Sequence, residues 1–557
     1  MVSFFSNSLL FGAFEKEKDV VIRQDWSLKG MPERPTLEPH FERVEEPYQK
    51  VCDLLPCLKG APVDPKAVAF TMTPDCFPLV GPIEGVPRFW LQAGYFDGVT
   101  TAGGIGKYVA DWIIDGEPPH ELFDTDANRY ARWADKKFLI ARTKESYSMF
   151  YNWAYEDRPA GRPTGRVSGV YGSLVRDGAH MAFRTGWEVP ASFSLGDEGY
   201  MRALMREYQM VTNKCGIVDL SWKGKIEVRG PEASALLSYV FSNEPPPIRH
   251  INTALMLTRS GRILAPLKVL HHDQNRSEFI LLSDPEREIR DYGWIKSAAK
   301  EMNFKVEISP VSEYLASLAL IGPNSRSVLA ELTKTDVSDK GFPRGSTKLM
   351  RLANVPVIAA QSSATGELGY ELFHNRADSL KLYQAIMREG AAYGIANFGL
   401  ATLNALRMEQ GFKLWGREIT LDTNPYEVGL GNLVDLNKKD FIGKTSAIEL
   451  SKKKYDRRQV LLQLDATASA ERICDVRQVP QGMEVVRREG KEERIGQITS
   501  GCFSVKLQRP LCFAWISNDV KDSETLVVDL GNQRIPAQIL DKPPAQPKVE
   551  GATSASI

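Results

Sequence analysis

The sequence lacks the features that mark several large classes of protein. No apolar run reaches the ~18–20 residues that a helix needs to cross a bilayer. Lysine plus arginine numbers 70 and aspartate plus glutamate numbers 70, so the 557-residue chain carries no formal net charge. A protein that binds nucleic acid by neutralising phosphates usually carries a basic excess. We therefore expect neither a membrane span nor a nucleic-acid partner.

Cysteine and histidine are sparse and scattered. The seven cysteines form no CxxC pair, and the seven histidines form no HExxH or Cys/His cluster. A disulfide scaffold and a metal site are therefore not expected, and reduced thiols inside the cell are the default. His271 and His272 follow an apolar run, and we interpret them as a solvated turn rather than a metal site.

Glycine-rich phosphate loops and targeting signals are missing as well. No GxGxxG occurs, and GKTS at 443–446 has Lys438 where a Walker loop needs glycine. The N-terminal residues lack the basic region of a signal peptide and the arginines of a transit peptide, and they become charged by Glu15. No import signal is therefore expected in this sequence.

The composition is that of an ordinary globular protein, with 43% hydrophobic and 25% charged residues. At about 150 residues per domain, the length allows roughly three or four domains. In the first 200 residues, the pattern predicts strands at 9–14, 20–26 and 89–94 and a helix at 44–55. Gly103, Gly104 and Gly106 are interpreted as a tight turn between a strand and a helix, and 120–200 as an irregular connection.

Strands and helices alternate from about residue 193 to 437. The pattern predicts a hairpin around Ser260 and Gly261 and amphipathic helices at 379–390 and 402–416. The basic segment 452–458 marks a second domain boundary, after which the chain is rich in strands to about residue 540.

Two groups of charged residues allow more than one interpretation. Glu367 and Glu371 lie in a glycine-containing segment, TGELGYEL, which is either a turn entering an edge strand with solvated glutamates or a site that a ligand approaches closely. Arg158, Arg162 and Arg166 form either an anion-binding cluster or a set of surface and interdomain ion pairs.

Seven segments, taken together and in order, carry a family resemblance. They are LLFGAFE (9–15), TPDCFPLVGP (73–82), AGGIGKYVADWIIDGEPP (102–119), RPAGRPTGRVSGVY (158–171), TGELGYEL (365–372), NFGLATLNALRMEQGFKLWGREI (397–419) and ITSGCFSVKLQRPLCFAWI (498–516). The chain resembles the dimethylglycine/sarcosine dehydrogenase family from about residue 9 to about residue 540.

The resemblance implies an α+β multidomain fold. The expected parts are the C-terminal part of an FAD-dependent oxidoreductase domain (1–135), a connecting segment (136–195), an aminomethyltransferase-like folate-binding domain of the glycine-cleavage T-protein type (196–450), a small C-terminal β-barrel (455–542) and a disordered tail (543–557).

The function implied is oxidative N-demethylation of dimethylglycine or sarcosine with FAD, and transfer of the methyl carbon to tetrahydrofolate. Electron-transfer flavoprotein is the implied electron acceptor, and the mitochondrial matrix the implied location. By residue, the resemblance assigns Gly98, Gly103, Gly104 and Gly106 to the flavin edge, where helix N–H groups stabilise a reduced flavin. It assigns Gly366, Tyr370 and Glu371 to folate, with the Glu371 carboxylate accepting two N–H bonds from the pterin ring.

Departures from the family pattern limit this assignment. Pro266 stands at the position of the family's acidic residue, so the catalytic group is unknown, and Ala364 replaces a tyrosine. The family's GxGxxG and flavin-linking histidine do not occur, so we expect this chain alone to bind flavin poorly. Three hypotheses therefore remain: a methylglycine dehydrogenase, a folate-binding module without oxidase activity, and a non-catalytic regulatory protein similar to the pyruvate dehydrogenase phosphatase regulatory subunit.

Overall fold

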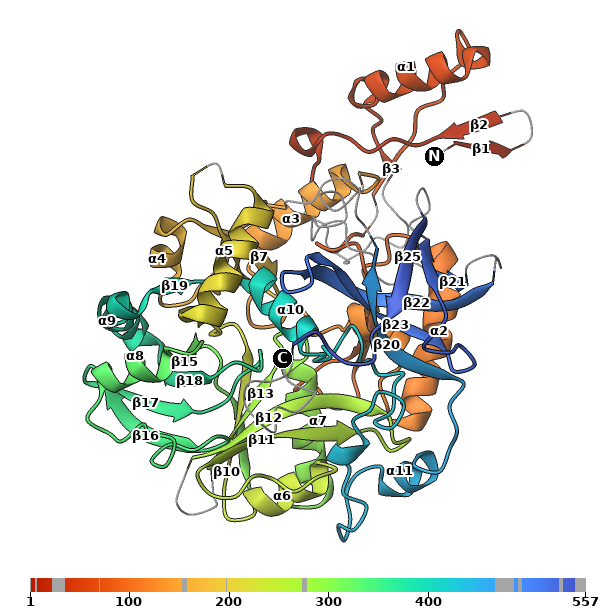
Figure 1. Ribbon diagram of the computed structural model, residues 1–557. Helices are drawn as coiled ribbons and strands as arrows, with labels where there is room; N and C mark the ends of the chain where they lie inside the picture. Colours follow the sequence, from red (N-terminus) through yellow and green to blue (C-terminus); the bar gives the residue numbers. More distant parts are fainter. Residues whose placement is uncertain are drawn as a thin grey trace. The chain divides into compact units, whose positions relative to one another are not determined.

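The computed structural model describes residues 2–5, 8–22, 36–69, 71–152, 158–196, 198–272, 278–465, 485–488, 493–529 and 534–545. The chain forms two compact units, Met1–Gly165 and Arg166–Ile557, and each is described by itself (Figure 1). Among the described residues, no helix has the length and apolar character that a membrane span requires.

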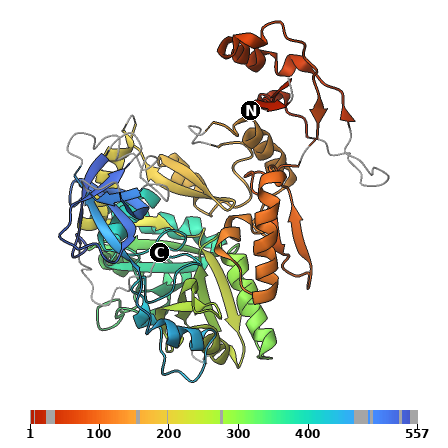
Figure 2. The ribbon, with the colours of Figure 1, turned by 90° about the vertical axis from the view of Figure 1, so that its right-hand side faces the viewer.

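Short hairpins and helices build the N-terminal unit. Its main elements are β1 (Val2–Phe5), β2 (Ser8–Phe11), β3 (Thr36–Leu37), α1 (Glu45–Leu54), β4 (Ala67–Val68), β5 (Leu79–Pro82), β6 (Trp90–Ala93), α2 (Gly98–Asp115) and α3 (Lys136–Ser148). Val80 of β5 and Val109 of α2 are buried in one apolar cluster, beside which Trp90 and Trp112 meet edge to face with ring centroids 5.3 Å apart. Helix α2 therefore packs against the β5–β6 hairpin (Figure 2).

Two sequence-based expectations are wrong in the first 200 residues. Residues 20–22 form no strand, and the rest of the predicted strand 20–26 lies outside the described residues. The segment 120–200 is not irregular, because it contains α3, α4 (Tyr171–Arg176) and the antiparallel hairpin of β7 (Ala179–Arg184) and β8 (Trp187–Phe193). Helix α3 has little amphipathic pattern, and the Asp135 side chain starts it by accepting the N–H of Phe138 at 2.7 Å.

Two sheets form the centre of the C-terminal unit. One has the strand order β11-β12-β13-β10-β14, and the other has the order β16-β17-β18-β15-β9-β19. Their strands are β9 (Cys215–Asp219), β10 (Gly224–Arg229), β11 (His250–Leu257), β12 (Ile263–His271), β13 (Glu278–Ser283), β14 (Glu307–Pro310), β15 (Leu315–Ile321), β16 (Thr347–Leu352), β17 (Val355–Ala360), β18 (Gly369–Asn375) and β19 (Ile395–Asn397). The helices are α5 (Tyr200–Asn213), α6 (Ala233–Val240), α7 (Glu288–Glu301), α8 (Ser325–Leu332), α9 (Ser379–Gly390), α10 (Leu400–Glu409) and α11 (Lys444–Leu450).

The two sheets meet through the faces of β12 and β18. Leu270 of β12 and Phe373 of β18 are buried in the same apolar cluster. Since side chains alternate along a strand, Pro266 and Lys268 share the face of Leu270, and Glu371 shares the face of Phe373. Pro266, Lys268 and Glu371 therefore lie on the faces that meet between the two sheets.

A closed β-barrel follows, in the strand order β20-β23-β22-β21-β24-β25. Its strands are β20 (Arg457–Leu464), β21 (Val485–Arg488), β22 (Arg494–Ser504), β23 (Arg509–Ser517), β24 (Leu526–Asp529) and β25 (Arg534–Ile539). Ala405 and Met408 of α10 join Phe513 of β23 in one apolar cluster, so this helix supports the barrel (Figure 1). The predicted α+β fold with a C-terminal barrel is confirmed, although α10 is shorter than the predicted 402–416 helix.

The predicted tail 543–557 lies outside the described residues from 546 onward. Its first residues are ordered, because the Ala545 N–H donates to the Glu409 carbonyl at 2.9 Å.

Candidate functional site

The glycines predicted to form a turn lie inside helix α2. The helix begins at Gly98, so Gly103, Gly104 and Gly106 are five or more residues within it, and the expected turn at these positions is wrong. Their N–H groups belong to the helical i→i−4 pattern, and only Gly98 has an N–H among the unbonded ones of the first turn. In the part of the N-terminal unit that the structure describes, nothing lies within 4 Å of a Cβ built at any of these three positions.

Glu371 lies on an internal strand and is buried. Strand β18 pairs with β17 and β15, and Glu371 is directly opposite Ala360 and Ala319 on those strands. Glu371 and Glu367 are each 5% exposed, which rules out the interpretation of an edge strand with solvated glutamates. Small alanines on both sides leave the Glu371 carboxylate without a polar neighbour from its own sheet at these paired positions.

The partner of Glu371 comes from the other sheet. Lys268 Nζ of β12 donates to Glu371 Oε1 at 2.8 Å, and the two side chains are 14% and 7% exposed. Lys268 is not among the residues that the sequence motifs predict. A signal was available, because Lys268 is the one charged residue in the apolar strand segment ILAPLKVL and its period-2 neighbour is Pro266.

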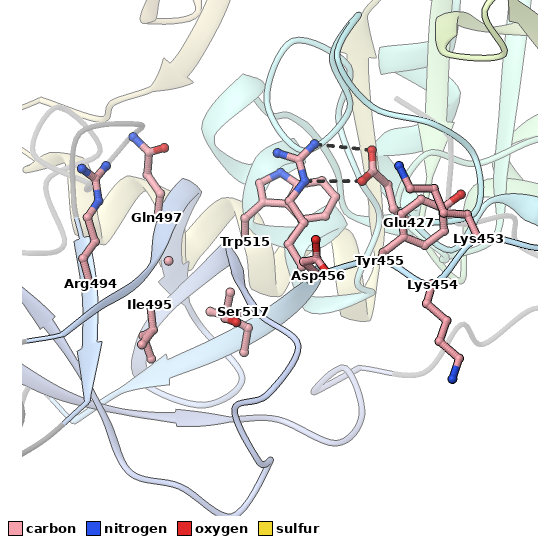
Figure 3. A pocket seen from close by; sticks show the side chains of 13 residues that line it. Glu427, Lys453, Lys454, Tyr455, Asp456, Arg494, Ile495, Gln497, Trp515 and Ser517 are labelled. Carbon is pink, nitrogen blue, oxygen red and sulfur yellow. Dashed lines mark hydrogen bonds and ion pairs between the residues drawn. The ribbon is translucent and has the colours of Figure 1, made fainter. Parts of the chain in front are cut away.

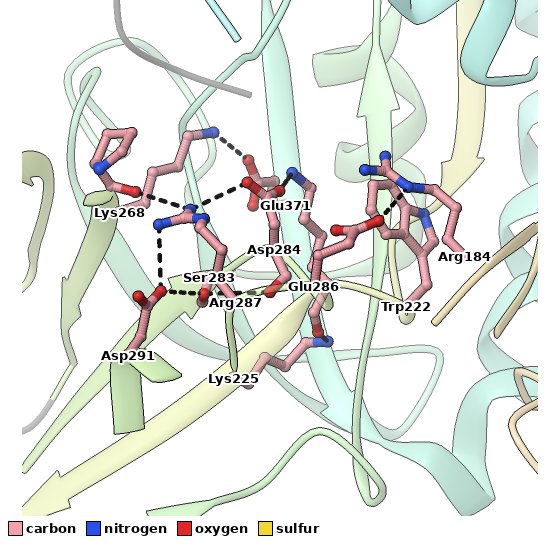
Figure 4. A network of polar contacts seen from close by, with 12 residues as sticks. Arg184, Trp222, Lys225, Lys268, Ser283, Asp284, Glu286, Arg287, Asp291 and Glu371 are labelled. Atoms are coloured by element: carbon pink, nitrogen blue, oxygen red, sulfur yellow. Dashed lines mark hydrogen bonds and ion pairs between the residues drawn. The ribbon is translucent and has the colours of Figure 1, made fainter. Parts of the chain in front are cut away.

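Pro266, two residues before Lys268 on β12, accepts a hydrogen bond through its carbonyl group. Arg287 Nη2 donates to the Pro266 carbonyl at 3.2 Å and to Asp284 Oδ2 at 3.0 Å, and Arg287 Nη1 donates to Asp291 Oδ2 at 3.2 Å (Figure 4). Strand β13 pairs with β12 only from Lys268 onward, so a proline fits here without losing a hydrogen bond to that strand. The position therefore offers a hydrogen-bond acceptor and no exchangeable proton.

Burial and neighbouring charges shift the pKa values of the ionisable groups near Arg287 in different directions. Burial opposes the ionisation of Asp284, but Lys223 and Arg287 hold the pKa of Asp284 well below its usual range. Burial raises the pKa of the Asp291 carboxyl above its ordinary value. The fully buried Lys225 donates to the carbonyls of Ser221 and Lys223, and burial lowers its pKa to about 8.

The other two residues predicted to bind folate, Gly366 and Tyr370, are explained by the turn and by the core in which they lie. Gly366 has φ +73°, and a Cβ there would lie 2.7 Å from the Gln410 side chain, so this turn requires glycine. Tyr370 is fully buried in the core on the opposite face of β18 from Glu371, with its ring 5.5 Å from that of Phe342. Ala364 is also buried in an apolar cluster. The structure therefore brings Lys268 to Glu371, with Pro266 on the same strand face as Lys268, but does not bring Tyr370 there.

The interpretation of His271 and His272 as a solvated turn is wrong for His271. It ends strand β12, is 1% exposed and stacks on Phe279 at 4.2 Å between ring centroids. The strand continues to His271 because it pairs with Phe279 of β13 and His250 of β11. In the described residues, no group of three His, Cys, Asp or Glu side chains could hold a metal ion.

Of the three arginines, the buried Arg166 pairs with the half-exposed Glu313, with Arg166 Nε 2.9 Å from Glu313 Oε1. Arg158 donates to the Ser146 hydroxyl at 3.1 Å. Ion pairing is therefore the better interpretation for Arg166. The GKTS segment also has local partners, since Lys444 Nζ donates to the Lys438 and Lys439 carbonyls.

A pocket of about 540 Å³ lies where the barrel meets the segment before it (Figure 3). Arg457 lies over the Trp515 ring at 4.5 Å from its centroid, and pairs with Glu427 and Asp422. None of the predicted site residues lines this pocket. Because the guanidinium of Arg457 is already paired, we do not assign the candidate site to this pocket.

Comparison with protein families supports the division seen in the structure. The chain matches FAD dependent oxidoreductase at residues 1–112 and its central domain at 115–167. It matches the GCVT N-terminal domain at 170–438 and the glycine cleavage T-protein C-terminal barrel domain at 457–545. A solved aminomethyltransferase T of the glycine cleavage system from Bartonella henselae has a TM-score of 0.58 and 21% identity, and covers 68% of this chain and 98% of its own. That likeness shows the fold of the C-terminal unit.

Three relatives bear on the family. Mitochondrial dimethylglycine dehydrogenase from Rattus norvegicus is 36% identical over 96% of this chain, which spans 63% of that relative's length. Mitochondrial sarcosine dehydrogenase from Mus musculus is 25% identical over 80% of this chain and 53% of its own. An aminomethyltransferase from Thermotoga maritima is 30% identical over 66% of this chain and 94% of its own. An FAD dependent oxidoreductase region precedes a glycine-cleavage T-protein region along the chain, as the family matches show. The chain therefore belongs to the dimethylglycine/sarcosine dehydrogenase family.

Proposed function

We propose that the protein is a dimethylglycine dehydrogenase-like protein of choline and glycine one-carbon catabolism whose C-terminal unit binds tetrahydrofolate. The observation that carries the proposal is Glu371: a buried carboxylate on an internal strand, facing the second sheet between alanines. A carboxylate in this position can accept two parallel N–H bonds from the amidine edge of a pterin. The surrounding residues therefore fit the group that the family implies.

The proposed site has a group that can bind folate, but at Pro266 it lacks the proton-transferring group that one-carbon transfer needs. Bound tetrahydrofolate would supply the amine nitrogens that take up a one-carbon unit. Pro266 cannot give or take a proton, and loss of a general acid or base at this position costs about 10²–10⁴-fold in rate. We therefore propose that Glu371 orients the folate while one-carbon transfer is slow.

The flavin part of the proposal depends on helix α2. Three interior glycines cost a helix about 0.5–1 kcal/mol each relative to alanine. No described residue of this unit fills the space beside them, so a flat ring lying against the helix would explain their presence. FAD, dimethylglycine or sarcosine, electron-transfer flavoprotein and the mitochondrial matrix are proposed from the family.

Calorimetric titration with tetrahydrofolate tests the folate site. We expect wild-type protein to bind, Glu371→Ala to lose binding, and the control Glu389→Ala, on the surface of α9, to bind as wild type does. Unchanged affinity of Glu371→Ala would show that another group anchors the pterin.

A non-catalytic role is the second candidate, favoured by Pro266. The mitochondrial pyruvate dehydrogenase phosphatase regulatory subunit from Mus musculus is 26% identical over 93% of this chain and 60% of its own. If tetrahydrofolate gives neither heat nor a shift in melting temperature, the regulatory role is the one that remains.

A further inference from the structure

Lys268 and Glu371 together form a paired hydrogen-bond donor and acceptor between the two sheets. The ammonium group has three N–H donors, and Glu371 accepts one of them. No second acceptor for Lys268 and no second donor to Glu371 are found among the residues that the structure describes. Glu371 Oε2, the second accepting position of Oε1 and two ammonium hydrogens therefore have no partner among these residues.

We propose that Lys268 selects ligands that present a carbonyl oxygen beside an amidine edge. This inference rests on the proposed folate site. A 4-oxopterin presents, in sequence, the 2-amino group, the N3–H and the C4 carbonyl. Glu371 accepts from the first two, and Lys268 donates to the third. A 2,4-diamino ring has a donor at C4 in place of the acceptor, so it brings an amino group against the ammonium of Lys268. It also carries no hydrogen on N3, so Glu371 loses one of its two donors.

The structure around the pair makes this selection depend on Lys268. Ala319 and Ala360 flank Glu371 on the neighbouring strands, so no polar side chain at those two positions can form a hydrogen bond with the ligand. The Pro266 ring lies on the same strand face as Lys268 and has no donor, and the Pro266 carbonyl accepts from Arg287. Lys268 is thus the donor that this face of β12 offers to a carbonyl group.

Binding of tetrahydrofolate and of 4-amino-4-deoxytetrahydrofolate, which differ at C4 and in the hydrogen on N3, tests the inference by calorimetry, because only the C4 difference depends on Lys268. A charge-assisted hydrogen bond to an acceptor that becomes a donor corresponds to about 10–100-fold in affinity. We expect the wild type to prefer tetrahydrofolate by at least about tenfold. Lys268→Arg should keep the preference, and Lys268→Met should lower it at least about fivefold, leaving the part that the N3–H donor to Glu371 contributes. The control Lys381→Met, on the exposed face of α9, should keep the wild-type ratio.

The outcomes separate this inference from the proposed function. If both ligands bind the wild type equally, or if Lys268→Met keeps the wild-type ratio with an unchanged melting temperature, Lys268 does not select the ligand while the folate site stands. If neither ligand binds the wild type, the folate site itself is wrong and this inference falls with it.

Discussion

Arg407 provides a sharp test of how the barrel is held to the rest of the C-terminal unit. Its side chain is 1% exposed, and its Nη1 donates to Glu418 Oε2 at 2.8 Å and to the Phe412 carbonyl at 2.9 Å. Nη2 donates to Ser500 Oγ of barrel strand β22 at 3.2 Å, and Nε donates to Asn404 Oδ1 at 2.9 Å. One guanidinium therefore joins α10, the following loop and the barrel.

Arg407→Met removes these donors and leaves Glu418 as an unpaired charge with no exposed surface. Breaking a buried pair in this way costs about 3–5 kcal/mol. Glu418 still accepts from Leu414 N at 2.9 Å and Thr499 Oγ1 at 3.0 Å, so we expect a loss at the lower end, about 3 kcal/mol, in the free energy of unfolding. Urea denaturation followed by circular dichroism measures it.

The double variant Arg407→Met/Glu418→Gln tests the reasoning behind this number. It removes the unpaired charge and keeps an oxygen for the remaining donors, so we expect it to recover at least half of the loss. A matched control is Arg229→Met, because Arg229 pairs with Glu227 and Glu278 but is 54% exposed; it should cost less than about 1 kcal/mol. A single-variant loss below that of the control, or a double variant less stable than the single one, would refute the explanation.

Three further predictions concern the other groups. The lowered pKa of Lys225, about 8, means that its burial costs stability below pH 8 and that this cost fades as the pH rises toward 10.5. The stability of Lys225→Met relative to wild type should therefore fall by about 3 kcal/mol from pH 7.5 to pH 10.5 in urea denaturation, on top of a constant loss from its two missing hydrogen bonds to carbonyls. A difference that does not change with pH would contradict the pKa. Gly104→Ala should raise the free energy of unfolding of the N-terminal unit by about 0.5–1 kcal/mol in calorimetry; a loss would show that packing requires the glycine. Pro266→Asp should raise the rate at which formaldehyde and tetrahydrofolate give 5,10-methylene-tetrahydrofolate by at least about tenfold, measured by stopped-flow absorbance, and an unchanged rate would mean that no proton is moved at this position.

The sequence predicts the elements whose pattern is strong and local. The hairpin of β11 and β12 has its turn at Ser260 and Gly261, and α9 spans the predicted residues 379–390. Helix α2 is predicted, but its start is not, because glycines are poor helix formers and the pattern places them before the helix. The hydroxyls of Thr100 and Thr101 bond back to the Asp97 carbonyl, and the helix has already begun at Gly98.

The candidate site is predicted only in part, because its contacts join distant segments. Glu371 follows from a motif, but the Lys268–Glu371 pair links residues 103 positions apart on two different sheets. His271 is misassigned for a similar reason, since its burial depends on pairing with Phe279 across an interval that the local pattern does not contain. Alternation along a strand tells which side chains share a face, but the partner of that face is set by how the sheets pack.

The ion pair also gives Glu371 two roles that a single substitution cannot separate. Glu371→Ala removes the pterin anchor and at the same time leaves Lys268 as a largely buried ammonium without a partner, which costs stability. Lost folate binding in that variant could then come from a rearranged site. Lys268→Met/Glu371→Ala removes both charges, so the gap between the sheets becomes apolar and the melting temperature should return toward that of the wild type. If tetrahydrofolate still fails to bind the double variant while Lys268→Met alone retains it, the carboxylate itself is the anchor; if the double variant binds, Glu371 serves the packing of the two sheets and another residue holds the ligand.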